Sequence, residues 1–97
     1  MMVIRVVIDV KPGLNAALEE HLRTESEQVR QMDGCLGYDL FQSTDYAACY
    51  LPYEEWASAD AFAVYRSSEL LKQSYAPLGP MLAGPPDSQY FEASPAV

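Results

Sequence analysis

Cysteine, histidine and basic side chains are scarce in this chain of 97 residues. Two cysteines and one histidine are too few for a disulfide framework or a closed zinc site, so we expect neither. The chain has 6 Lys and Arg against 14 Asp and Glu, which gives a formal net charge of −8. Nucleic acids and anionic membrane surfaces are bound mainly through Lys and Arg, so we expect the chain to bind neither.

Long apolar runs and glycine-rich phosphate-binding motifs are also missing. No apolar run approaches the roughly 20 residues that span a bilayer. Met1–Val10 contains Arg5 and Asp9 and lacks a cleavage site of small residues, so we do not expect a signal peptide and place the chain in the cytoplasm. Neither a P-loop nor GxGxxG occurs, so we expect no nucleotide cofactor.

The length bounds the architecture, because a typical domain has about 100 to 150 residues. We therefore expect one domain over residues 1–97, with 93–97 as a frayed tail. A domain of this size buries only about 60 to 65% of its unfolded surface, which makes association with another chain expected.

Hydrophobic periodicity predicts strands and helices in a mixed order. The predicted strands are Val3–Val10, Leu36–Ser43, Tyr50–Trp56 and Ser88–Glu92. The predicted helices are Asn15–Met32, a short helix that opens at Ala59, and Glu69–Tyr75.

Turn and capping residues set the expected ends of these elements. Gly34 should cap the first helix, and Ser58 and then Ser67 or Ser68 should begin the later ones. Pro77 should end the last helix. Pro52 cannot donate to a β-ladder, so it predicts a bulge or an edge strand.

The order β, α, β, β, α, β is that of the split βαβ, or ferredoxin-like, α+β fold. Right-handed crossovers place the helices on one face of a four-stranded antiparallel sheet. Apolar residues of both parities in the strands indicate that the other face is also covered. We therefore predict a face-to-face homodimer, a dimeric α/β barrel.

Three segments resemble the antibiotic biosynthesis monooxygenase domain family: Val29–Tyr38, Gln42–Asp45 and Tyr53–Phe62. The resemblance covers nearly the whole chain and implies a ferredoxin-like dimer with a cavity between sheet and helices. It also implies, for some members, oxidation of polycyclic phenols by O₂ without metal or flavin, whereas other members cleave haem. Members often carry a histidine where this chain has Tyr65, which disfavours haem cleavage.

Aromatic side chains are the first candidates for a binding site. Tyr38, Tyr50, Trp56, Phe62 and Tyr65 lie on elements that can face one cavity. The alternative is that these rings fill a solid core, since each aromatic side chain buries about 150 to 250 Å² of surface in a typical core.

Three charged or titratable side chains are candidates for chemistry. Glu54 shares a strand face with Trp56, and its burial would raise its pKa, although an ion pair with an arginine is equally open. His21 could act as a base oriented by Glu25, or could be a boundary residue of its helix. Arg66 could hold a phenolate or carboxylate, or could be a surface charge.

These observations lead to a functional hypothesis. We expect a cofactor-independent monooxygenase or oxidase that acts with O₂ on an aromatic polyketide-like phenol. His21 or Glu54 would remove the phenol proton, and Trp56 and Tyr65 would hold the ring. The alternatives are a non-catalytic dimer that binds a hydrophobic small molecule, and an isomerase or cyclase on the same scaffold.

Overall fold

Eight elements follow one another in the computed structural model, which describes residues 1–97. They are β1 (Met2–Asp9), α1 (Asn15–Val29), β2 (Cys35–Gln42), β3 (Cys49–Trp56), α2 (Ala59–Arg66), α3 (Glu69–Leu78), the 3₁₀ turn η1 (Gly79–Met81) and β4 (Asp87–Glu92).

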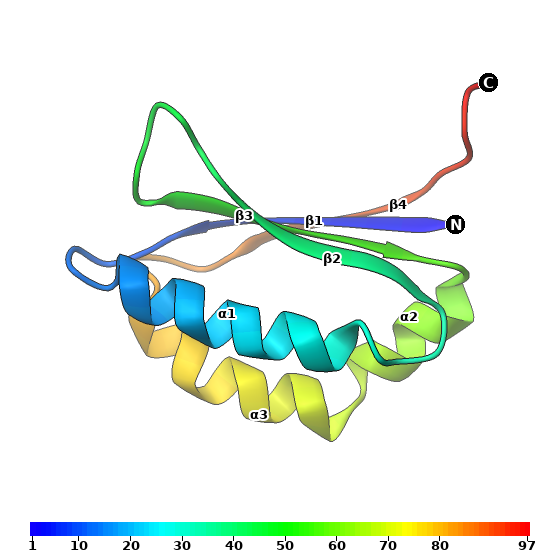
Figure 1. Ribbon diagram of the computed structural model, residues 1–97, viewed down its shortest axis with the longest axis horizontal. Coiled ribbons are helices and arrows are strands. Elements are labelled where there is room, and N and C mark those ends of the chain that lie inside the picture. The colour runs from blue at the N-terminus through cyan, green and yellow to red at the C-terminus, as the bar shows by residue number, and fades with distance from the viewer.

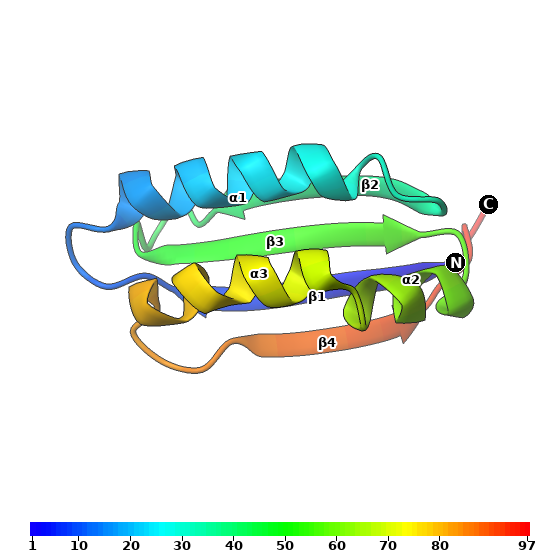
Figure 2. The same ribbon diagram turned by 90° about the horizontal axis from the view of Figure 1, so that it is seen from below.

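The four strands form one antiparallel sheet in the order β2-β3-β1-β4, and every helix lies on the same face of it (Figure 1). Seen from the helical side, α1 covers the β2 side of the sheet, and α2 and α3 cover its middle and its β4 side (Figure 2). The predicted ferredoxin-like α+β fold is confirmed.

Two serines begin the later helices as predicted. The Ser58 side chain accepts a hydrogen bond from the Ala61 backbone N–H, and Ser68 accepts one from Leu71. Each cap satisfies a backbone donor that has no partner within its own helix. The second cap allows the chain to break between α2 and α3 and to continue at an angle.

Two predicted helix ends are wrong. α1 ends at Val29 rather than Met32, because the next residues form i to i−3 bonds, with the Met32 N–H donating to the Val29 carbonyl at 3.0 Å. α3 continues through Pro77 to Leu78 rather than stopping at Tyr75. Proline in this last turn forfeits one backbone bond but keeps a helical φ, so the turn survives.

Pro52 lies on an interior strand, which corrects the expectation of an edge or a bulge. β3 is flanked by β1 and β2, and Pro52 pairs opposite Leu40. Pairing with β1 stops at Arg5 and resumes at Ile8 without a change of register, so the strand absorbs the missing N–H as a local gap in the ladder. The bulge of the sheet lies in β2, between Cys35 and Gly37.

At the C-terminal end, β4 pairs with β1 along its whole length. The backbone of Ala93, a residue expected in the frayed tail, still exchanges hydrogen bonds with Met1, at 2.8 and 2.9 Å. No helix of the chain is both long enough and apolar enough to cross a membrane.

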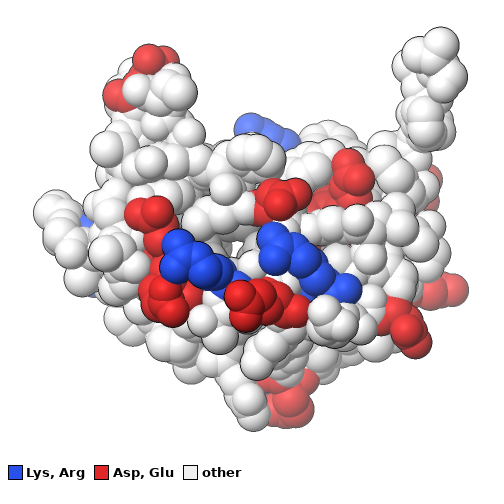
Figure 3. All heavy atoms as spheres, viewed as in Figure 1, with Lys and Arg blue, Asp and Glu red and all other residues white.

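The sheet face opposite the helices carries apolar side chains with nothing packed over them. Leu36, Phe41 and Phe91 are 57%, 53% and 46% exposed. The β2–β3 loop and the C-terminal tail rise from opposite ends of this face (Figure 1). Acidic side chains at the tip of that loop and along the flank reflect the negative charge of the chain (Figure 3).

Gly34 is the tightest turn position, and it generates a stability prediction. Its φ is +84°, and an added Cβ would lie 2.5 Å from the Ala61 Cβ. Gly34→Ala should therefore lower the free energy of unfolding by about 2 to 4 kcal/mol, from backbone strain plus overlap. Chemical denaturation measures this loss.

Gly13 provides the matched control, because its φ is +82° and nothing lies within 4 Å of a Cβ placed there. Gly13→Ala should cost only the backbone penalty of about 1 kcal/mol. Equal losses at the two positions would show that the contact with Ala61 contributes nothing.

Candidate functional site

A cavity of about 180 Å³ lies between the sheet and the helices. Its wall consists of 17 residues, which come from all four strands, all three helices and the loop before β4, and 11 of these residues are hydrophobic. A cavity of about 150 Å³ with apolar walls accepts a benzene ring, so this one has room for at least one ring of an aromatic ligand. The polar groups that converge on it are few, as in most small-molecule sites.

Glu54 contributes a carboxylate to this cavity from the middle of the sheet. The alternation of β3 points its side chain towards the helices, where it is 5% exposed. It accepts a hydrogen bond from Trp56 Nε1 at 2.9 Å, and it forms no ion pair with Arg5 or Arg66. Burial raises the pKa of Glu54 to about 7; the Trp56 bond opposes this shift, and the negative charge of Glu25 adds to it.

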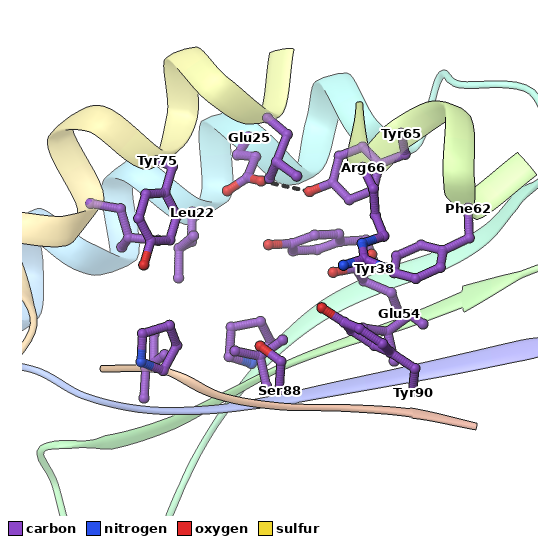
Figure 4. A pocket seen from close by; sticks show the side chains of 17 residues that line it. Leu22, Glu25, Tyr38, Glu54, Phe62, Tyr65, Arg66, Tyr75, Ser88 and Tyr90 are labelled. Carbon is purple, nitrogen blue, oxygen red and sulfur yellow. Dashed lines mark hydrogen bonds between the residues drawn. The ribbon is translucent and has the colours of Figure 1, made fainter. Parts of the chain in front are cut away.

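Glu25 contributes a second buried carboxylate, from α1. It is 5% exposed and accepts a hydrogen bond from the Tyr65 hydroxyl at 2.9 Å (Figure 4). The Tyr65 ring stacks on Trp56 with centroids 5.1 Å apart. The two carboxylates are thus held by two stacked rings, each of which donates to one of them.

Tyr38 reaches into the cavity from β2 (Figure 4). Burial, and then the negative charges of Glu25 and Glu54, raise the pKa of the Tyr38 hydroxyl well above its usual value. The hydroxyl therefore stays protonated across the physiological range and can donate a hydrogen bond to an anionic oxygen in the cavity.

Arg66 borders the cavity from the end of α2. Its guanidinium lies 5.6 Å from the Phe62 ring centroid and 4.8 Å from that of Tyr90, which are cation–π distances. Phe62 and Tyr90 in turn contact each other edge to face, with centroids 5.2 Å apart. We call Phe62, Arg66 and Tyr90 the arginine cluster.

The structure brings most of the candidates from the sequence together and separates three of them. Tyr38, Glu54, Phe62, Tyr65 and Arg66 line the cavity. Trp56 is fully buried behind the wall and acts on the cavity through Glu54 and Tyr65.

Two of the predicted residues lie elsewhere. The His21 ring nitrogen Nε2 contacts the Ser74 carbonyl at 2.8 Å, and His21 is not part of the cavity wall. The expected hydrogen bond between His21 and Glu25 is wrong: the His21 ring bonds Ser74, and Glu25 accepts a hydrogen bond from Tyr65. Tyr50 packs in the other half of the core and donates to Glu19 at 3.0 Å.

Glu25 and Tyr90 also line the cavity, although neither was predicted from the sequence as a residue of the site itself. A signal for Glu25 was present, because Leu22 and Val29 of the apolar stripe of α1 are seven positions apart, and Glu25 lies between them at helical spacing. Tyr90 carried no comparable signal. Its role depends on the pairing of β4 with β1, which sets it opposite Ile4 on the cavity side.

Nowhere in the chain do three or more His, Cys, Asp or Glu side chains gather closely enough to hold a metal ion. The charged groups on the cavity wall are two carboxylates and one guanidinium. This arrangement can accept a proton, donate hydrogen bonds to an oxyanion and exclude water from an aromatic ring.

The raised pKa of Glu54 predicts a pH-dependent stability. The neutral Glu54 carboxyl stabilises the folded state. This stabilisation is fully present below pH 4.5, the pKa of glutamate in the unfolded chain, and is lost as the pH rises through about 7, the pKa in the folded chain. The loss should reach about 3 kcal/mol in the free energy of unfolding. Glu54→Gln should remove this part of the pH dependence, which chemical denaturation at a series of pH values measures. If the free energies of unfolding of the variant and the unaltered protein change in parallel with pH, the prediction is wrong.

Comparisons with known proteins agree with this architecture. A protein from Caulobacter crescentus CB15, named as a candidate antibiotic biosynthesis monooxygenase, matches with a TM-score of 0.91 at 27% identity, over 97% of this chain and 90% of that one. A similarly named protein from Deinococcus radiodurans matches with a TM-score of 0.92 at 20% identity, over 100% and 96% of the two chains.

A third such protein, from Nitrosomonas europaea, matches with a TM-score of 0.89 at 22% identity, over 96% of this chain and 98% of that one. None of the curated proteins matches this chain. The model of the antibiotic biosynthesis monooxygenase family matches residues 1–76, which include β1 to α2 and most of α3. The chain therefore belongs to the antibiotic biosynthesis monooxygenase family.

Proposed function

We propose that this protein is a cofactor-independent monooxygenase that oxidises an aromatic polyketide-like phenol with O₂. The observation that carries the proposal is the buried Glu54 carboxylate, whose pKa is about 7, in a cavity walled by aromatic rings. Such a reaction needs a substrate that becomes electron-rich once deprotonated, so the protein must supply a base, an oxyanion donor and a dry pocket.

Glu54 is the proposed base. A group with a pKa near the working pH is partly ionised and still basic enough to take a proton. His21 was the other candidate from the sequence, but its ring lies outside the cavity, against Ser74. Tyr38 would donate a hydrogen bond to the oxyanion that forms, because its own proton is held tightly beside two carboxylates.

The electron-rich anion then reacts with O₂ directly. One electron passes from the substrate anion to O₂, and the resulting radical pair combines into a C–O bond. In an anthrone-type substrate the O–O bond then breaks, so that one oxygen atom remains as a carbonyl and the other leaves as water with the two hydrogens of that carbon. The stacked Trp56 and Tyr65 rings hold Glu54 and Glu25 in place during these steps.

A homodimer is part of the proposal. The apolar face of the sheet, with Leu36, Phe41 and Phe91 about half exposed, is the kind of surface that a second copy covers. Pressing two such faces together would shield the sheet beneath each cavity from water. It would also supply buried area that a chain of this size lacks alone.

Glu54→Gln should abolish most of the oxidation. A positioned base contributes a factor of about 100 to 10,000, and glutamine cannot take the proton. The measurement is O₂ uptake by metal-free protein with an anthrone or a naphthol. In the unaltered protein, kcat/KM should rise with pH through about 7, the pKa of Glu54.

His21→Gln is the control, because it removes the histidine outside the cavity and should leave the rate nearly unchanged. Loss of O₂ uptake in this variant but not in Glu54→Gln would assign the base to His21. If the protein binds these phenols without consuming O₂, it is a ligand-binding dimer. If it converts them without oxygen, it is an isomerase or cyclase.

Phe41→Glu should convert the dimer into a monomer, because it places a charge on each of two facing apolar surfaces. Sedimentation equilibrium distinguishes the two masses. Val64→Glu serves as the control, since Val64 is 64% exposed on α2, on the helical side of the sheet. A monomeric unaltered protein would overturn the proposed assembly.

A further inference from the structure

We infer that Arg66 is the recognition site for a carboxylate carried by the aromatic ligand, so that the preferred ligand is a phenol with an acidic substituent. The inference rests on the proposed function in one respect, namely that an aromatic ring occupies the cavity. It assigns to the arginine cluster a ligand class that the proposed reaction does not itself require.

Arg66 differs from the other arginines in having no polar partner within the chain. Arg5 donates to Gln89, Arg23 to Glu20 and Arg30 to the Tyr38 carbonyl. The Arg66 side chain takes part in no hydrogen bond or salt bridge of the structure. Its five N–H donors are therefore available to a ligand.

The surrounding rings fix the guanidinium without using those donors. Phe62 and Tyr90 contact it through their π-faces, at 5.6 and 4.8 Å from the ring centroids. No polar group of the chain pairs with the guanidinium, so its N–H donors remain open to a planar bidentate partner. A carboxylate has the matching geometry.

The position of Arg66 sets where the acidic group would lie. The side chain is directed towards the cavity, on the side where Tyr65, Tyr90 and Phe62 converge (Figure 4). It is the single cation on the wall, whereas Glu25 and Glu54 would repel an anion placed deeper. The ring and its phenol group would therefore enter first, with the carboxylate held at the boundary.

The arginine cluster also borders a second, more open hollow. This hollow has a volume of about 410 Å³ and shares Phe62, Arg66 and Tyr90 with the cavity. Arg66 thus lies between the cavity, which has room for a ring, and a more open hollow that extends towards Met2 and Ala59. A carboxylate on the ligand can reach the guanidinium at this boundary without being fully desolvated, which keeps the cost of binding the charge low.

The test is calorimetric binding of matched phenols to the intact protein at pH 7. The three isomeric hydroxybenzoates carry the carboxylate, and the three methylphenols are their neutral counterparts. At least one hydroxybenzoate should bind about tenfold more tightly than its methylphenol, which is the effect of one charge-assisted bidentate contact.

Arg66→Gln should abolish this preference, so that the hydroxybenzoate and its methylphenol bind about equally tightly. Arg66→Lys keeps the charge but loses the planar guanidinium, and should retain only part of the preference. Both variants alter an exposed side chain, and thermal denaturation checks that they fold. The inference is overturned if no hydroxybenzoate binds measurably, if methylphenols bind equally well, or if Arg66→Gln keeps the preference.

The binding and oxidation experiments distinguish failure of the carboxylate site from failure of the proposed monooxygenase activity. A preference for hydroxybenzoates that depends on Arg66, without O₂ uptake with any phenol, would leave the carboxylate site standing and remove the proposed monooxygenase activity. O₂ uptake with neutral phenols and no preference would do the reverse.

Discussion

Burial of the Glu54 carboxylate is the constraint on which the site depends. The side chain lies on the helical face of an interior strand, where a charge without a partner would be very costly. The protein meets this cost with one N–H, from Trp56, and by keeping the group neutral up to about pH 7. Trp56 is in turn held by the stacked Tyr65 ring, so that helix α2 and strand β3 together fix one functional group.

The cavity exists because the core is divided. One buried cluster contains Ile4, Tyr38, Trp56, Phe62, Tyr65 and Val29, and the other contains Ile8, Val10, Leu18, Leu22, Tyr50 and Leu82. Residues of both clusters line the cavity, which lies between them. Glu25, Glu54 and Pro52 lie on its wall among apolar side chains of the two clusters.

Much of the fold could be predicted from periodicity and capping. The four strands and the Ser58 and Ser68 caps follow from local patterns, because each is set by residues close in the sequence. The ends of α1 and α3 could not be predicted in this way, because the residues after Val29 change to i to i−3 bonds and Pro77 remains within the last helical turn. The interior position of Pro52 depends on sheet order, which no local signal encodes.

The candidate site was predictable in its residue types but not in its grouping. The two-residue period of β3 put Glu54 and Trp56 on one face, and their contact followed. His21 could not be excluded from sequence, because only the placement of α3 turns its ring towards Ser74. Tyr90 could be assigned to the site only from the pairing of β4 with β1, and the arginine cluster depends on the same pairing.

The site depends above all on the Glu54 carboxyl changing its charge near pH 7 within the cavity, well above the range of an ordinary glutamate. The most direct measurement is a titration of that carboxyl followed by its ¹³C chemical shift, with Glu54→Gln used to assign the resonance. We expect a midpoint near 7. A midpoint near 4.5, the value of an unperturbed glutamate, would contradict it.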